Sequence, residues 1–329
     1  MKKVMYKIDE VINMIRQDKK LLLAGDEELL KKLPDGNWIG GSIPYFMTES
    51  GGMVSKDLIL VNEIPSFVKE IKCKSYDIAT IKNVYKDGFE NGFSVIIIPG
   101  FSETHLSFAI NAPDYKEFAT KPLIGWISGF LLDDPNGKTA KTFIGSGKSV
   151  SDKNAVVMHI CLPSEKYAEI STINIFDQGE GDIIEFPESG FQVKDAFING
   201  KKENFVDYVT RKQLDIRLPL VADYSGMMIN ISFQNINKEA KTVEFYAPVF
   251  KGISYKQASP VKDYIKQFTQ LIPDGGTNDI TFSCNCILNY LYSELEGKKT
   301  GTITGPITFG EIAYQLLNQT MVNIEIKDF

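Results

Sequence analysis

The sequence predicts an α+β protein with mixed α/β layers, in two lobes that each hold a mixed, largely antiparallel β-sheet packed with helices. Apolar runs of strand length recur through the first half of the chain, at 58–61, 93–98, 122–132 and 155–162. Helical apolar periods lie among these runs. Residues 172–190 are instead acidic and rich in Gly, which is typical of a connection. We therefore expect one lobe over 1–170, a connection over 171–190 and a second lobe over 191–329.

The first lobe begins with alternating helices and strands. Apolar residues at helical spacing predict a helix over 5–16, and a buried strand follows over 21–25. Asp26 is placed to cap a helix over 27–33 that has acids in its first turn and lysines in its last. Residues 38–46 should be extended. Their two central glycines would weaken a strand unless another backbone or a ligand comes close.

The rest of the first lobe should contain a helical segment over 113–118 and a hairpin. Asn136-Gly137 lies between the apolar pair 131–132 and the apolar run 142–144, and this dipeptide is a strong hairpin signal.

The second lobe alternates in the same way, with turn residues between its elements. Pro260 stands where a helix can start, and the breaker at 273–276 ends that helix. The remaining predicted elements are a hairpin over 193–200, a helix over 203–213, strands over 227–233, 242–249, 279–286 and 320–326, and helices over 287–296 and 311–317.

Composition excludes several classes of protein. The 329 residues are 43% hydrophobic and 24% charged, which is ordinary for a globular protein. The net charge of −6 argues against binding nucleic acid, which requires clustered Lys and Arg. Charged residues interrupt the N-terminal segment, which therefore lacks the apolar core of a signal peptide. No apolar run reaches the roughly 20 residues that span a bilayer. We expect a cytoplasmic protein with four reduced cysteines and no membrane partner.

Three motif-like stretches lack the residues that their chemistry needs. The run 145–149 resembles the end of a phosphate loop, but Thr142 occupies the position of the first glycine. Ser102 follows a strand as a nucleophile elbow would, but Thr104 replaces the second glycine. With only two histidines, a Ser-His-Asp triad is not expected, and no second Cys or His pair completes a zinc site with Cys284-x-Cys286.

Cys284 and Cys286 stand at a predicted junction between a strand and a helix. The dipole at a helix N-terminus favours a thiolate, so either thiol could be reactive if exposed, but free Cys is also a common core residue. Glu311 should open the helix 311–317, where it would cap backbone N–H groups or receive a ligand ammonium. Asn318 should lie at the far end of that helix, where an amide can satisfy carbonyls.

Several short motifs resemble the FIST sensory domain family. The C-terminal half of that family has a cysteine strand, a Gly-Glu turn and a terminal Asn-x-Thr strand. The motifs that match here are Ser283-Cys284, Gly305, Thr308-Phe309-Gly310-Glu311, Asn318-Gln319-Thr320, the hairpin at 193–200, Leu218-Pro219-Leu220 and Pro122-Leu123-Ile124-Gly125. The arginine that often follows the family's cysteine is missing, which places any anion-pairing role for it in doubt.

The resemblance implies a stand-alone cytoplasmic sensor that binds a small polar metabolite, such as an amino acid, between its lobes. It would need no cofactor or metal, and it would signal through a separate protein partner or as a homo-oligomer. The expected ligand contacts are Gly40, Gly41, Ser42, Cys284, Asn285, Gly310, Glu311 and Asn318. Two alternatives remain open at this point. One is an enzyme that uses Cys284 or Cys286 with Glu311, and the other is a self-assembling interaction protein.

Overall fold

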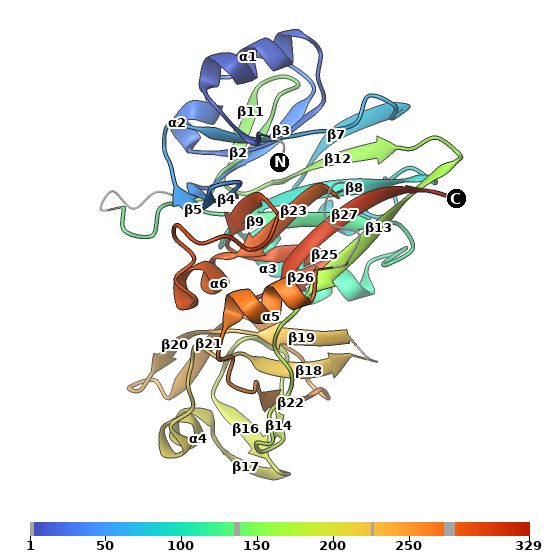
Figure 1. Ribbon diagram of the computed structural model, residues 1–329. Helices are drawn as coiled ribbons and strands as arrows, with labels where there is room; N and C mark the ends of the chain where they lie inside the picture. The colour runs from blue at the N-terminus through green and yellow to red at the C-terminus, as the bar shows by residue number, and fades with distance from the viewer. Residues whose placement is uncertain (1–2, 135–138, 225–226, 273–279) are drawn as a thin grey trace.

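The structure is a computed structural model that describes residues 3–134, 139–224, 227–272 and 280–329. Within these residues the strands form four six-stranded sheets and one three-stranded sheet, with short helices packed on them (Figure 1). Both mixed and antiparallel sheets are present. The predicted α+β class is confirmed.

The first sheet has the strand order β1-β6-β2-β3-β10-β11 and carries two helices. Val11 and Ile15 of α1 pack with Leu30 of α2 against this sheet in one apolar cluster. Asp26 caps α2 as predicted, since its Oδ1 accepts from the Glu28 N–H at 2.9 Å. The elements are β1 (Met5–Tyr6), α1 (Ile8–Arg16), β2 (Leu21–Gly25), α2 (Glu27–Leu30), β3 (Trp38–Ser42), β6 (Ile59–Glu63), β10 (Thr142–Ile144) and β11 (Ser149–Ser151).

The second sheet has the strand order β26-β25-β9-β8-β12-β7, and its strands β8, β9 and β25 are almost entirely buried. Its strands β8 and β9 are parallel, and the unbroken apolar run of β8 is typical of a strand covered on both faces. The elements are β7 (Glu70–Tyr76), the 3₁₀ turn η1 (Ile81–Asn83), β8 (Gly92–Pro99), α3 (Glu103–Asn111), the 3₁₀ turn η2 (Ala112–Asp114), β9 (Leu123–Ser128), β12 (Ala155–Cys161), β25 (Glu311–Ala313) and β26 (Gln315–Leu317).

The third sheet, β13-β27-β23-β24-β4-β5, combines strands from distant parts of the chain. Helix α6 follows β23 directly, as the sequence predicts, but it is shorter than expected. The elements are β4 (Tyr45–Thr48), β5 (Gly51–Val54), β13 (Lys166–Ile173), β23 (Ile280–Cys286), α6 (Ile287–Tyr292), β24 (Gly305–Thr308) and β27 (Met321–Asp328).

The last two sheets lie together in the lower part of Figure 1. An aromatic core joins them, in which Phe186 and Phe245 pack against Phe205 of α4. The elements are β14 (Ile184–Glu185), β15 (Gly190–Val193), β16 (Asp195–Ile198), β17 (Lys201–Asn204), α4 (Phe205–Lys212), β18 (Leu220–Tyr224), β19 (Met227–Ile231), β20 (Phe233–Asn237), β21 (Thr242–Val249), β22 (Ser254–Gln257) and α5 (Tyr264–Gln270).

The predicted lobe boundary does not separate two sets of sheets. Pro306 of β24 pairs with Phe46 of β4, and Glu311 of β25 pairs with Trp126 of β9. Strands from the last fifty residues therefore complete sheets that the first half of the chain begins. The sheets formed by residues 184–257 alone are the ones that exclude both ends of the chain.

Two predicted helices are wrong. Residues 311–317 form the hairpin of β25 and β26, which turns at Tyr314 with a φ of 61°. β25 pairs with β26 and with β9, and the local sequence pattern does not indicate these pairings. In place of a helix over 113–118, α3 comes earlier and is capped by Ser102. The predicted turn at Asn136-Gly137 and the breaker at 273–276 lie outside the described residues.

None of the helices in the described part of the chain is long and apolar enough to cross a membrane.

Candidate functional site

Glu311 lies at the centre of a buried polar cluster in which the side chains of β23, β24 and β25 meet. Its Oε2 accepts from the Thr320 hydroxyl at 2.9 Å and from the Thr320 N–H at 3.2 Å. Its Oε1 is 3.5 Å from the Thr308 hydroxyl, and the Cys286 thiol also hydrogen-bonds the carboxyl. We call Cys284, Cys286, Thr308, Glu311 and Thr320 the Glu311 cluster.

Burial dominates the chemistry of this carboxyl. Glu311 has no exposed surface, and desolvation raises its pKa to about 8 even though four hydrogen bonds favour the charged form. At neutral pH the side chain is therefore mostly a neutral acid. Such a group holds a proton in the core and releases it as pH rises through its pKa.

The two thiols are core groups. Cys284 and Cys286 are each 1% exposed, and the Cys284 thiol points to the Gly125 carbonyl at 3.4 Å. Burial first, and then the charge of Glu311, raise the pKa of both thiols well above its usual range. A nucleophilic thiol needs the opposite shift. The helix α6 that follows Cys286 does not lower the pKa enough to overcome burial.

Asn285 points from the other face of β23 toward α5 and α6. Its Oδ1 accepts from Asn289 Nδ2 at 3.0 Å and from the Cys286 N–H at 2.7 Å, and its Nδ2 donates to the Tyr264 hydroxyl at 3.3 Å. Asn289 Nδ2 also reaches the Thr320 carbonyl at 3.4 Å. This amide pair therefore connects β23 to both helices.

Gly310 and Asn318 belong to the interior as well. The Gly310 carbonyl accepts from the Ile127 N–H and the Thr308 hydroxyl. Asn318 has no exposed surface, and its carbonyl accepts from Asn230 Nδ2 at 3.1 Å. Asn318 lies in the turn before β27 and not at the end of a helix.

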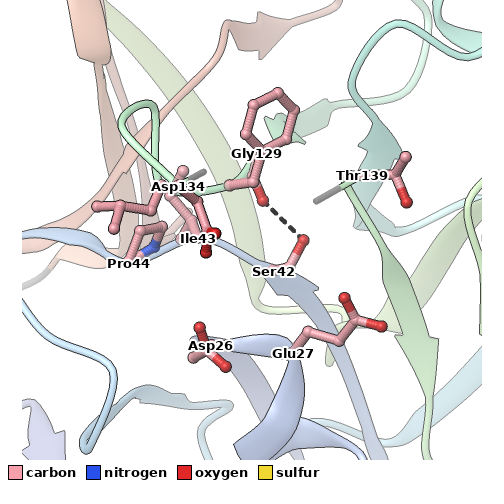
Figure 2. A pocket seen from close by; sticks show the side chains of 10 residues that line it. Asp26, Glu27, Ser42, Ile43, Pro44, Gly129, Asp134 and Thr139 are labelled. Atoms are coloured by element: carbon pink, nitrogen blue, oxygen red, sulfur yellow. Dashed lines mark hydrogen bonds between the residues drawn. The ribbon is translucent and has the colours of Figure 1, made fainter. Parts of the chain in front are cut away.

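Gly40, Gly41 and Ser42 lie away from this cluster, on β3. A Cβ at Gly41 would lie 2.5 Å from the indole of Trp126, so the missing side chain makes room for a core residue. Ser42 donates to the Gly129 carbonyl at 2.7 Å (Figure 2). It also accepts from the Lys141 N–H at 2.8 Å. The cavity beside Ser42 measures about 10 Å³, which is room for one water molecule.

Gly41→Ala should therefore lower the free energy of unfolding by about 1–3 kcal/mol, because the added methyl group overpacks the core against Trp126. Trp126→Phe removes the indole atoms that clash and leaves the contact with Ile97 Cγ2 at 2.7 Å, so the double variant should lose less stability than the two single losses added together. Urea denaturation of the four proteins measures this coupling. Strict additivity would contradict the contact.

One cavity of the described chain is a groove of about 540 Å³, within the size range of metabolite sites. It lies where the segment before β18 meets α5 and α6. Its walls combine apolar and aromatic side chains with charges of both signs. We call it the groove, and its lining is Phe176, Asp215, Arg217, Leu218, Pro260, Val261, Lys262, Asp263, Tyr264, Ile265, Asn289, Tyr292, Ser293, Glu294, Lys298 and Gln319.

The groove contacts the predicted site through two of its lining residues. Tyr264 and Asn289 line it, and both hydrogen-bond Asn285, which lies behind them. Asn289 is 2% exposed, and its Oδ1 has no partner among the described residues. A buried amide oxygen without a donor is unusual.

Charge pairs line the groove walls. Arg217 binds Asp215 through two nitrogens, with a shortest distance of 2.7 Å between Nη2 and Oδ2. Lys298 lies 3.9 Å from Glu294. Burial raises the pKa of Tyr292, whose ring forms part of the wall. The groove thus offers both signs of charge beside aromatic surface.

Sequence reasoning missed the groove residues. None of the predicted ligand contacts lines it, although Asn285 lies directly behind it. Its lining comes from segments near 215, 262 and 292 that carry ordinary surface charges. The sequence marked a helix start near Pro260, but that pattern predicts a helix and gives no indication of a cavity.

The histidines and Ser102 have structural roles. Ser102 caps α3 and donates to the Pro99 carbonyl at 2.7 Å. Burial lowers the pKa of His105 and of His159 to about 4, so both rings are neutral at pH 7. His159 lies between Ser94 and Tyr76, at 2.7 and 2.8 Å. Neither histidine lines the groove.

Comparison with known proteins gives a family and no activity. Residues 6–327 match the model of a family described as a family of unknown function (DUF6976). No curated protein matches the chain.

Proposed function

This chain belongs to DUF6976, a family of unknown function, and we propose that its groove binds a small polar metabolite, such as an amino acid. The observation that carries this proposal is the cavity of about 540 Å³, whose lining combines charges of both signs with aromatic surface.

The walls favour a ligand that carries both charges. Asp215 and Arg217 present a carboxylate and a guanidinium side by side, and Lys262 and Glu294 add one charge of each sign. A zwitterion can face both signs, whereas an ion of one sign meets repulsion from half of them. Tyr292 and Phe176 supply apolar surface for a small side chain.

The biological role that we propose is sensing. The resemblance to the FIST family motivates a cytoplasmic sensor that passes its ligand state to a separate protein partner or to a second copy of itself. The buried thiols do not favour the alternative of a cysteine-dependent enzyme, since both have a raised pKa and neither reaches the groove. The self-assembling alternative is tested by light scattering with and without ligand.

A thermal-shift screen tests the binding proposal. The 20 common amino acids and a panel of polar metabolites are added singly at millimolar concentration. A ligand present at about 100 times its Kd stabilises the native state by about 2.7 kcal/mol, which raises Tm measurably. A panel that leaves Tm unchanged throughout would overturn the proposal.

Arg217→Gln should then weaken binding of the identified ligand at least tenfold, because a charge-assisted hydrogen bond is lost. Arg211→Gln is the matched control. Arg211 is exposed and pairs with Glu203 at 2.7 Å, but it lies outside the groove. Calorimetric titration of both variants gives the comparison, and equal losses in the two would place the ligand elsewhere.

A further inference from the structure

The groove lies where two parts of the fold meet. We call the two sheets formed by residues 184–257 the lower body, and the other three sheets, with α6, the upper body (Figure 1). The chain leaves the upper body after β13 and leaves the lower body after β22. Phe176 and Pro260, which follow these two strands, both line the groove. The groove therefore borders the junction of the bodies, which is a common place for a ligand.

Each body contributes one pair of opposite charges to the groove. On the lower body Arg217 binds Asp215, and on the upper body Lys298 lies 3.9 Å from Glu294, just after α6. Tyr292 of α6 senses the other body, because the charges of Asp215 and Arg217 act in opposite directions on its pKa, which burial raises most. The two charge pairs thus border one cavity from different bodies.

The carboxylate of Glu294 is only weakly engaged by the protein. Its side chain is 87% exposed and that of Lys298 is 47% exposed, so their long ion pair is a weak one. The backbone of Glu294 has a φ of 50°, at the position after the C-cap Ser293 of α6, where Gly or Asn is the usual residue. A glutamate at this position therefore costs stability and leaves its carboxylate open to a ligand.

Gln319 fixes Arg217 relative to the upper body. Its Nε2 donates to the Arg217 carbonyl at 3.1 Å, and its Oε1 accepts from the Ser232 hydroxyl at 2.7 Å. Gln319 lies in the turn before β27 and is 2% exposed, so both polar groups of a buried side chain bond to the lower body. The guanidinium of Arg217 binds Asp215 through Nε and Nη2, which leaves Nη1 for another acceptor.

We propose that the groove takes an extended zwitterion, which bridges the two bodies with its carboxylate on Arg217 and its ammonium on Glu294. This inference rests on the proposed binding function of the groove, and it names the class of ligand. The two charges of that ligand stand several bonds apart, as in an ω-amino acid or a short peptide. Each end would form a charge-assisted hydrogen bond, and Leu218 and Tyr292 would pack on the part between them.

The arrangement of the charges explains why the ends should be separated. A zwitterion with both charges on one carbon can face only one pair, and each pair already neutralises itself. Separated charges can face the cation of one pair and the anion of the other. The reverse orientation is the weaker one, since it places the ammonium on Asp215, whose two oxygens Arg217 already binds, and the carboxylate on the flexible stem of Lys298.

Calorimetric titration of the wild-type protein tests the spacing and does not depend on the folding of a variant. The probes are glycine, γ-aminobutyrate, ε-aminocaproate and triglycine, which carry the same two charges at different separations. We expect the best of the three longer compounds to bind at least about tenfold more tightly than glycine, because it engages both bodies. Comparing ε-aminocaproate with triglycine tells a hydrocarbon spacer from a peptide. Glycine binding as tightly as the best longer compound, or no binding by any of the four, would overturn the proposal.

A second titration shows which end each body holds. The wild type should bind ε-aminocaproate at least about tenfold more tightly than hexylamine, which lacks the carboxylate, or caproate, which lacks the ammonium. Arg217→Gln should remove the advantage over hexylamine, and Glu294→Gln the advantage over caproate. Arg211→Gln and Glu203→Gln are the matched controls, since this surface pair lies outside the groove and both preferences should persist. Variants of Arg217 and Glu294 that weaken all three compounds equally would overturn the assigned contacts, because a merely structural role does not distinguish the ends.

The titrations also separate this inference from the proposed function. If metabolites bind in the thermal-shift screen but no longer zwitterion surpasses glycine, the groove is a binding site and the bridging is wrong. If no metabolite of the panel and none of the four zwitterions binds, the binding function is wrong as well.

Discussion

Gly125→Ala is expected to destabilise the native state severely at 25 °C. An added Cβ would lie 1.8 Å from the Ile96 carbonyl oxygen and 2.8 Å from Ile96 Cγ2. Ile96 is the parallel partner of Gly125, in the pairing of β8 with β9 at the centre of the buried sheet. A backbone atom there cannot move aside as the end of a side chain does, so β9 would have to leave β8.

The expected loss exceeds about 4 kcal/mol, a size seen only when a core element is disrupted, whereas whole domains are stable by about 5–15 kcal/mol. Circular dichroism and urea denaturation measure it. Gly181→Ala is the matched control, since a Cβ at Gly181 meets nothing within 4 Å, and it should change stability by less than about 1 kcal/mol. A Gly125→Ala protein that unfolds at the wild-type urea concentration would show that the two strands are not in contact at this point.

The same geometry shows how much a sequence can predict about its strand glycines. The composition of residues 38–46 correctly indicates that something approaches the backbone closely. What approaches Gly41 is the Trp126 indole, and what approaches Gly125 is the Ile96 backbone. A pattern along one strand reports that space is needed. It does not report whether a ligand or the protein itself fills that space, because the occupant comes from elsewhere in the chain.

Most strands were predictable and their partners were not. The apolar runs near β8, β9, β12, β23 and β27 mark strands because apolar residues of strand length are bounded by turn residues. The pairing of β25 with β9 joins residues almost two hundred positions apart, and no local period encodes it. For the same reason residues 311–317 resemble a helix in isolation and form a hairpin in the fold. Tertiary pairing outweighs a weak local preference.

The candidate site, too, was predictable only in part. The residues from Cys284 to Thr320 do come together around one carboxyl, which their unusual composition indicated. The groove beside them is built from common surface residues such as Lys262 and Glu294, supplied by segments far apart in the sequence. The groove exists only once these segments have come together in the fold, so no local pattern encodes it.

Glu311→Gln should abolish the main pH dependence of stability between pH 5 and 8. Burial raises the pKa of Glu311 from 4.5 to about 8 in the folded state, so the folded state holds a proton that the unfolded chain releases. The contribution of this group is fully present below pH 4.5. It falls by up to about 1.4 kcal/mol per pH unit above that value and levels off once pH exceeds the folded pKa.

A glutamine keeps the shape and the neutrality of the protonated acid. Its carbonyl oxygen can still accept from the Thr320 hydroxyl and N–H, so the variant should match the wild type near pH 5. Near pH 9 it should be the more stable protein by several kcal/mol, because the wild type must either bury a carboxylate or give up the fold. Urea denaturation at intervals from pH 5 to 9 measures both curves.

Glu239→Gln controls for the removal of one negative charge, since that side chain is exposed. Its curve should run parallel to the wild type. If the Glu311→Gln curve does so too, Glu311 is ionised in the native state at neutral pH, and its hydrogen bonds to Thr320, Cys286 and Thr308 outweigh its burial. The donors of the cluster would then stabilise a buried carboxylate. The slope of the Glu311→Gln curve, compared with that of the wild type, thus decides whether Glu311 is a carboxylate or a protonated acid in the native state at neutral pH.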